Sequence, residues 1–148
     1  MINPTNPTDS RMKKCLIIDD DTDDQEIFLM CLRKVNKHID CKVASDGAEA
    51  VSLLQSTIEY TPDYIFIDLN MPKMNGIDCL KKIKSIERLS GTKMFMYSTT
   101  SEPHAISQSK DFGANEFIVK PVKTTDLKEK LFSIFNLVSE IDKPSSQP

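Results

Sequence analysis

Acidic side chains follow two short apolar stretches of this sequence. Residues 64–67, YIFI, lead directly into Asp68. Residues 14–18, KCLII, lead into Asp19 and Asp20. Removing a carboxylate from water is costly, so an acid with no other role belongs in a solvated turn rather than beside a buried strand. The position of these three acids therefore indicates that they bind a ligand or take part in a reaction.

The same three acids have suitable chemistry for a divalent cation. Carboxylates that are brought together repel one another, and a hard cation relieves the repulsion. Mg²⁺ prefers oxygen ligands and usually binds one or two carboxylates while it keeps several waters. We expect Asp20 and Asp68 to bind Mg²⁺ directly and Asp19 to act through water. The backbone carbonyl of Asn70 is the candidate for a further ligand.

Two further apolar stretches end in groups that can bind an anion. Residues 93–97 lead into Ser98, whose hydroxyl can donate to an anionic oxygen. Residues 116–119 lead into Lys120, whose ammonium can offset the charge of that oxygen. A metal, a hydroxyl and a lysine around one carboxylate describe a site for phosphoryl transfer, which depends on positioning and charge stabilisation. Asp68 is the candidate nucleophile, because a carboxylate can form an acyl phosphate.

Each of these features alone has a simpler explanation. The acids of residues 19–24, DDDTDD, could form the solvated start of a helix, where the helix dipole favours negative charge. We expect no more than this of Asp21, Asp23 and Asp24. A Lys-Pro pair after a strand is also a common turn. The combination of these groups at successive strand ends is what favours a phosphoryl site.

Five short apolar runs alternate with stretches of helical spacing. The runs are continuous, as expected for strands that are buried on both faces of a parallel sheet. We therefore predict one α/β domain, a doubly wound parallel sheet with helices on both faces. In such sheets ligands bind beyond the carboxyl ends of the strands. The predicted strands are residues 14–18, 41–44, 64–67, 93–97 and 116–119.

Local signals indicate where helices begin and where the domain ends. Residues 22–25, TDDQ, match a capping box, and residues 46–49, DGAE, are a second candidate cap. We expect the folded domain to span residues 13–139. The flanking segments, 1–12 and 140–148, are rich in Pro, Ser, Thr and Asn, and we expect both to be flexible tails.

The composition excludes several classes of protein. A chain of 148 residues with 39% apolar and 28% charged residues is typical of one globular domain. The net charge of −3 argues against nucleic-acid binding, and no apolar run has membrane-spanning length. The N-terminus lacks the apolar core of a signal peptide, so we expect a cytoplasmic protein. The four cysteines form no CxxC pair, and we expect reduced thiols.

Four segments together have a highly specific pattern. They read LIIDDD (16–21), FIDLNMPKMNG (66–76), FMYSTT (95–100) and GANEFIVKP (113–121). In this combination the sequence resembles the receiver domain of bacterial two-component response regulators, of the chemotaxis single-domain type. The resemblance covers about residues 13 to 139. It implies a flavodoxin-like (βα)5 fold with strand order 2-1-3-4-5.

The resemblance implies a role for each candidate residue. Asp68 would be the phosphoacceptor. Asp19 and Asp20 would be the acidic pair that holds Mg²⁺, with the Asn70 backbone carbonyl as a further ligand. Lys120 would contact the phosphoryl oxygens, and the peptide bond that follows Lys120 would be cis.

A conformational switch is implied as well. Ser98 would bond the phosphoryl group and move on activation, and Phe117 would turn into the space it vacates. Phe117 stands where Tyr is more common, so it has no hydroxyl to anchor the inward position. Asn70, Thr99 and Thr100 occupy positions that tune the lifetime of the phosphate, and Thr99 is larger than the residue usual there.

The predicted function is a stand-alone signalling switch rather than an enzyme. A sensor histidine kinase or a histidine phosphotransfer protein would donate the phosphoryl group to Asp68. The face built from the fourth helix, fifth strand and fifth helix would then change shape and bind a downstream protein. We expect a monomer or a weak homodimer that binds neither nucleic acid nor membrane.

The sequence is also compatible with two alternative functions. The protein could be a phosphorelay intermediate that passes the phosphoryl group on, or an adaptor that binds partners without being phosphorylated. An aspartyl phosphatase is disfavoured, because residues 68–70 read DLN and lack the second acid of the DxD pattern. A flavin-binding protein would need a phosphate-cradling loop, and the four glycines are too scattered to form one.

Overall fold

The computed structural model describes the backbone of residues 12–142 and the surroundings of side chains up to residue 135. Residues 1–11 and 143–148, which make up most of the two predicted tails, lie outside the described residues. The strands are β2 (Lys14–Ile18), β3 (Asp40–Ala44), β4 (Tyr64–Ile67), β5 (Lys93–Ser98) and β6 (Glu116–Val119). The helices are α2 (Thr22–Val35), α3 (Gly47–Ser56), α4 (Gly76–Lys84), the 3₁₀ helix η1 (Glu87–Leu89), α5 (Pro103–Asp111) and α6 (Thr124–Asp142).

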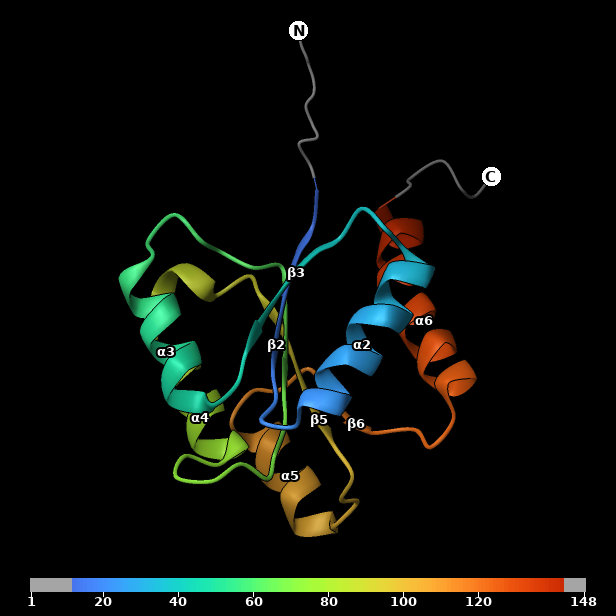
Figure 1. Ribbon diagram of the computed structural model, residues 1–148. Coiled ribbons are helices and arrows are strands. Elements are labelled where there is room, and N and C mark those ends of the chain that lie inside the picture. The colour runs from blue at the N-terminus through green and yellow to red at the C-terminus, as the bar shows by residue number, and fades with distance from the viewer. Residues whose placement is uncertain (1–11, 143–148) are drawn as a thin grey trace, which may run out of the picture.

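The five strands form one parallel sheet in the order β3-β2-β4-β5-β6. Counted along the chain, this is the predicted order 2-1-3-4-5, so the fold class is confirmed. All five predicted strands are present, and β3 and β5 are each one residue longer than predicted. Helices cover both faces: α2 packs with α6 on one side of the sheet, and α3 packs with α4 on the other (Figure 1).

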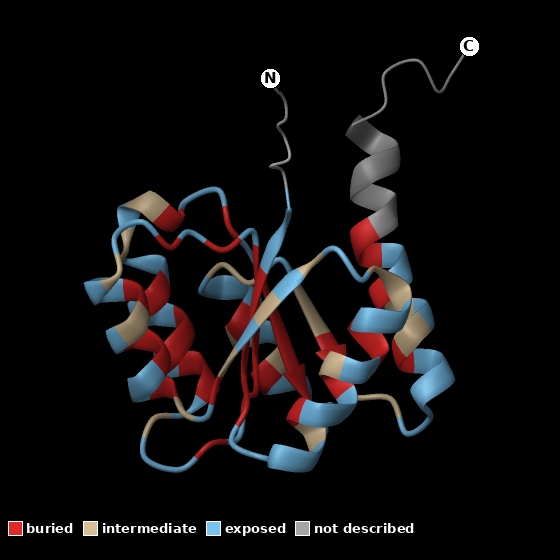
Figure 2. Ribbon diagram, turned by 45° about the horizontal axis from the view of Figure 1, so that its top comes forward, coloured by how far each residue is buried: buried red, intermediate tan, exposed pale blue. Residues whose placement is uncertain are grey.

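Each face of the sheet has its own hydrophobic core, because successive strand residues point to opposite faces. The core under α3 and α4 is aliphatic and methionine-rich, whereas the core under α2 and α6 is aromatic. In the aromatic core Phe28 of α2 meets Phe66 of β4 edge to face, with ring centroids 4.9 Å apart. The buried strands between two layers of amphipathic helices are visible in Figure 2. The aliphatic core includes Leu16, Ile18, Ile65, Ile67, Met94 and Met96, and the aromatic core includes Tyr64, Phe66, Phe95, Tyr97 and Phe135.

The predicted cap of α2 is wrong by one residue. Asp21, not Thr22, is the N-cap: its backbone is extended and its Oδ1 accepts a hydrogen bond of 3.0 Å from the Asp24 N–H. Gln25 does not complete a capping box, because its side chain is buried and donates to the backbone oxygen of Asp19 at 2.6 Å. The cap predicted for α3 is confirmed, since Asp46 Oδ1 accepts from the backbone N–H at position 49 at 2.7 Å.

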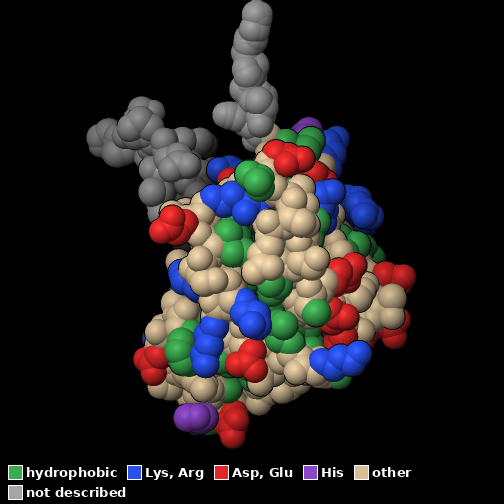
Figure 3. All heavy atoms as spheres, turned by 90° about the vertical axis from the view of Figure 1, so that its left-hand side faces the viewer, with side chains coloured by type: hydrophobic (Ala, Val, Ile, Leu, Met, Phe, Trp, Pro, Cys, Tyr) green, Lys and Arg blue, Asp and Glu red, His purple; other side chains and the backbone are tan. Residues whose placement is uncertain are grey.

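The outer surface carries mixed charge where α3 and α4 face the solvent. Figure 3 shows acidic and basic side chains close to one another on this side of the molecule. A basic face of the kind that nucleic acid requires is not present on this side. Within residues 12–142, no helix is both long enough and apolar enough to cross a membrane.

Candidate functional site

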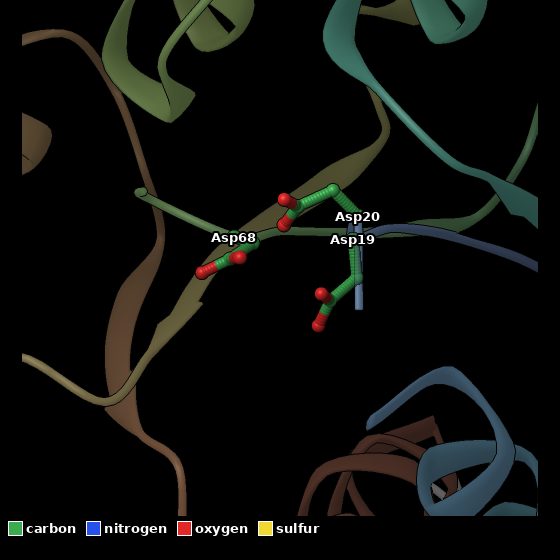
Figure 4. Close-up of side chains that lie close together, drawn as sticks. All are labelled: Asp19, Asp20 and Asp68. Carbon is green, nitrogen blue, oxygen red and sulfur yellow. The ribbon is translucent and has the colours of Figure 1, made fainter. Parts of the chain in front are cut away.

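Three carboxylates meet at the carboxyl ends of β2 and β4. Asp19, Asp20 and Asp68 each offer an oxygen, and these oxygens all lie within 4.8 Å of one another (Figure 4). The sheet itself fixes two of them, because the Asp68 N–H donates to the Ile18 oxygen at 2.9 Å and the Asp19 N–H donates to the Ala44 oxygen at 3.0 Å. Asp19 and Asp68 are buried, whereas Asp20 is exposed.

Lys120 brings a positive charge to this cluster from the end of β6. Its backbone N–H donates to the Ser98 oxygen at 2.7 Å, which ties the two strand ends together. The Lys120 Nζ lies 2.8 Å from Asp19 Oδ2 and 3.8 Å from Asp68 Oδ1. Its side chain is only 8% exposed, and the Nζ lies 5.2 Å from the centroid of the Tyr97 ring. The ammonium is therefore held inside the acidic cluster.

A third acid contacts the same ammonium, and the sequence analysis did not predict it. Asp24 Oδ2 lies 2.8 Å from the Lys120 Nζ. Asp24 was expected to be no more than a solvated acid at the start of the helix. This prediction is wrong, because its carboxylate is 34% exposed and forms an ion pair with Lys120. Asp24 stands in the first turn of α2, which begins just after β2 and so lies at the same edge of the sheet.

The electrostatics of the cluster explain why it would attract a cation. The pKa of Asp68 is raised to about 7: burial raises it most, Lys120 opposes this, and the charges of Asp19 and Asp20 add to the rise. Burial also raises the pKa of Asp19, although the hydrogen bond from Lys120 opposes this. Burial lowers the pKa of Lys120, but its hydrogen bonds to Asp19 and Asp24 outweigh that effect and the net change is upward.

These residues fit a hard divalent cation. The cluster offers only carboxylate oxygens, which are the ligands that Mg²⁺ prefers. A cation among the three acids would favour their ionised forms and would offset the burial of Asp19 and Asp68. The backbone N–H of Asn70 lowers the pKa of the Asp68 carboxyl and so favours its ionised form. The predicted role of the Asn70 carbonyl as a metal ligand stays a prediction.

A glycine that the sequence analysis did not single out sets the path of the loop after Asp68. A Cβ atom at Gly76 would lie 2.4 Å from the Asp68 backbone oxygen and 2.7 Å from the Leu69 Cα. The Gly76 N–H donates to the Leu69 oxygen at 2.7 Å, which closes the loop. Lys73 in the same loop has a φ of 70°, a conformation that costs a non-glycine residue about 1–2 kcal/mol. The loop is thus tightly constrained beside the candidate phosphoacceptor.

The comparisons with known proteins agree with this geometry. The family model of the response regulator receiver domain matches residues 15–132. The chain belongs to this family. In sequence the receiver is similar to the chemotaxis protein CheY-3 of Vibrio cholerae serotype O1, with 34% identity over 122 residues, which cover 82% of this chain and 91% of that protein. Receiver domains of this kind are the signalling domains of two-component systems.

Two solved structures are close to the receiver in fold. One is the phosphorylated cyanobacterial phytochrome response regulator RcpA, with a TM-score of 0.75 and 27% identity over 82% of this chain and 90% of that one. The other is a chain of the CheX–CheY–BeF3–Mg²⁺ complex from Borrelia burgdorferi, with a TM-score of 0.70 and 26% identity over 83% of this chain and 89% of that one.

The remaining predicted residues belong to β5, to β6 and to the segment that follows β5. Ser98 is the last residue of β5 and is fully buried, and its Oγ is 3.5 Å from the backbone nitrogen of Thr100, which donates to it. Thr99 is exposed. Phe117 is half-buried in β6 and packs against the aliphatic core.

One expectation about this part of the receiver is wrong. Within the described part of the chain no peptide bond is cis, so the bond that follows Lys120 is trans. The resemblance implied the cis form at this position. A proline nitrogen makes the two forms close in free energy, with trans favoured by about 0.5–1 kcal/mol.

Proposed function

We propose that this receiver accepts a phosphoryl group on Asp68 in the presence of Mg²⁺. The observation that carries the proposal is the meeting of Asp19, Asp20 and Asp68 with Lys120 at one edge of the sheet in a chain of the receiver family. The donor would be a phosphorylated histidine, either of a sensor histidine kinase or of a histidine phosphotransfer protein. Ser98, at the adjacent strand end, completes the set of groups that face the phosphoryl group.

In the proposed reaction an oxygen of Asp68 forms a bond to phosphorus while the bond from phosphorus to the donor imidazole nitrogen breaks. The electron pair of that bond stays on the imidazole nitrogen, and the product on Asp68 is an acyl phosphate. When bound, Mg²⁺ would supply positive charge beside the phosphoryl oxygens. Asp19 and Asp20 would hold the ion together with Asp68.

Lys120 and Ser98 would stabilise the charge on the transferred group. The Lys120 ammonium is 3.8 Å from Asp68 Oδ1, so a phosphoryl oxygen attached there is within its reach. The Ser98 hydroxyl would donate to another phosphoryl oxygen. Asp68 must be ionised to act as nucleophile. Its pKa is about 7 without a bound cation, and Mg²⁺ would favour the ionised form.

The proposed output is protein binding by the face formed by α5, β6 and α6. Movement of Ser98 toward the phosphoryl group would let Phe117 turn inward and change this face. Apolar side chains are already exposed on β6, on the segment after it and on α6: Val119 is 44%, Val122 100% and Phe132 57% exposed. CheY occurs with CheX in the complex from Borrelia burgdorferi, and a protein partner is the kind of output we propose here.

A non-phosphorylated adaptor remains the alternative from another class. In an adaptor that is never phosphorylated, the burial of Asp68, which raises its pKa, would lower the stability of the fold without serving a function. A relay intermediate would use the same site and the same chemistry. It would differ only in passing the phosphoryl group from Asp68 to a second histidine.

Intact mass spectrometry tests the proposal. The protein is incubated with Mg²⁺ and acetyl phosphate, beside Asp68→Asn and a sample that contains EDTA. We expect the wild type to gain the mass of one phosphoryl group only with Mg²⁺, and the variant to gain none. Equal labelling of Asp68→Asn would show that the site is elsewhere. Absence of both labelling and Mg²⁺-dependent beryllofluoride binding in the wild type would favour the adaptor.

A further inference from the structure

The ammonium of Lys120 is shared unequally among three acids. It lies 2.8 Å from Asp19 Oδ2 and 2.8 Å from Asp24 Oδ2, but 3.8 Å from Asp68 Oδ1. The first two distances are those of charge-assisted hydrogen bonds, whereas the third is too long for one. Lysine has three N–H donors, and two of them are committed to Asp19 and Asp24. The ammonium is therefore held about 1 Å short of hydrogen-bond distance from the candidate phosphoacceptor.

Asp24 differs from the other acids in its place in the fold. Asp19, Asp20 and Asp68 form the group of oxygens that could share one cation, and the Asp24 carboxylate is not part of it. Asp24 belongs to the first turn of α2, where its backbone N–H donates to Asp21 Oδ1 at 3.0 Å and fixes the residue in place. Its carboxylate makes its hydrogen bond in the site to the Lys120 ammonium.

We propose that Asp24 is a positioning residue that holds Lys120 in the unphosphorylated arrangement and competes with a phosphoryl group on Asp68 for its ammonium. This inference rests on the proposed function. A phosphoryl group brings anionic oxygens to the Asp68 side of the ammonium, and the Asp24 carboxylate attracts the same ammonium from the α2 side. Asp24 also adds a negative charge near an anion that is about to bind. Both effects weaken the phosphorylated state, so Asp24 biases the switch toward the unphosphorylated arrangement.

Removal of this carboxylate should have opposite effects on the anion and the cation. In Asp24→Asn the ammonium is free to turn to Asp68, so affinity for beryllofluoride, a mimic of the phosphoryl group, should rise at least about threefold. Affinity for Mg²⁺ alone should fall, because one negative charge is lost and Lys120 competes more strongly for Asp19 and Asp68. A variant that merely disturbs the fold would weaken both.

Asp23→Asn is the matched control. Asp23 is the neighbouring acid of the same helical turn, and it is exposed. The substitution removes the same charge from the same end of α2 without touching Lys120. Both affinities should stay within about twofold of the wild type, as expected for an exposed charge that is screened by water. Asp24→Glu keeps the carboxylate and should return both affinities toward the wild-type values.

The experiment is isothermal titration calorimetry on the full chain, first with Mg²⁺ alone and then with beryllofluoride at saturating Mg²⁺. The inference predicts tighter beryllofluoride binding and weaker Mg²⁺ binding in Asp24→Asn, with Asp23→Asn unchanged. Unchanged or weaker beryllofluoride binding in Asp24→Asn would overturn the inference, since Asp24 would then be neutral or would hold Lys120 in a productive place. Failure of the wild type both to bind beryllofluoride with Mg²⁺ and to be labelled by acetyl phosphate would instead overturn the proposed function itself.

Discussion

Replacement of Asp68 by Asn should stabilise the metal-free protein at neutral pH. Burial is the largest cause that raises the pKa of Asp68 from 3.8 to about 7; Lys120 opposes it, and Asp19 and Asp20 add to it. In the unfolded chain the group returns to its ordinary value near ~3.9. Between these values the unfolded state binds fewer protons than the folded state, so the free energy of unfolding falls as pH rises from ~4 to ~7.

The magnitude follows from the size of this shift. About three pKa units at 1.36 kcal/mol each give ~4 kcal/mol as the upper limit of the cost of ionising Asp68 in the folded state. The loss is ~3 kcal/mol at pH 6 and reaches ~4 kcal/mol, close to this limit, by pH 8. Asn resembles the protonated acid and has no charge to lose at either pH. Asp68→Asn should therefore be more stable than the wild type, with an advantage that grows from pH 6 to pH 8.

Urea unfolding followed by circular dichroism in EDTA measures this directly. Asp23→Asn serves as the matched substitution at an exposed acid, and it should lose a little stability at both pH values because the helix dipole favours an acid there. The reasoning is refuted if Asp68→Asn is no more stable than the wild type at pH 8, or if its advantage does not grow between pH 6 and pH 8. Added Mg²⁺ should stabilise the wild type and leave Asp68→Asn almost unchanged.

Three further predictions test the surroundings of the site. Asp20→Asn should weaken Mg²⁺ binding in a calorimetric titration; an unchanged affinity would remove Asp20 from the metal ligands. Gly76→Ala should lower the free energy of unfolding in urea by about 1–3 kcal/mol, because the added Cβ would meet the Asp68 backbone oxygen. Gly91→Ala is the control: a Cβ there has no atom within 4 Å, so the free energy of unfolding should change little. Equal effects of the two would contradict the loop argument. Ser98→Ala should slow labelling by acetyl phosphate about tenfold, because it removes one hydrogen bond to a charged group. A time course of intact mass measures the rate, and an unchanged rate would exclude a hydrogen bond from Ser98 to the phosphoryl group.

The sequence predicted the sheet and the residues at its edge because buried parallel strands leave a strong pattern. Strands such as YIFI (64–67) are continuous apolar runs, and the residue that follows each run is placed at the carboxyl edge by the topology alone. That is why Asp19, Asp68 and Lys120 could be grouped before their distances were known. Asp46 as a cap was predictable for a similar reason, since the signal is local.

The predictions failed where several similar residues compete for one role. In DDDTDD, Asp21 and Thr22 are both good N-caps, and only the backbone conformation decides between them. The same run does not reveal that Asp24 meets Lys120, because the two residues are 96 positions apart in sequence. The bond after Lys120 is trans, and the free-energy difference between the two forms of such a bond is small, so the sequence is a poor guide to it. The role of Gly76 was not predicted, because it comes from the close approach of the backbone and not from a side chain.

Chemical trapping of the acyl phosphate tests the central claim most directly. Borohydride reduces the carbonyl carbon of an aspartyl phosphate to an alcohol and releases phosphate, which marks the phosphorylated residue permanently. The protein is treated with Mg²⁺ and acetyl phosphate, reduced, digested and sequenced by mass spectrometry. The account predicts homoserine at position 68, and only in the sample that contained both Mg²⁺ and the phosphodonor. Reduction at another aspartate, with position 68 intact, would contradict the assignment of Asp68 as the phosphoacceptor.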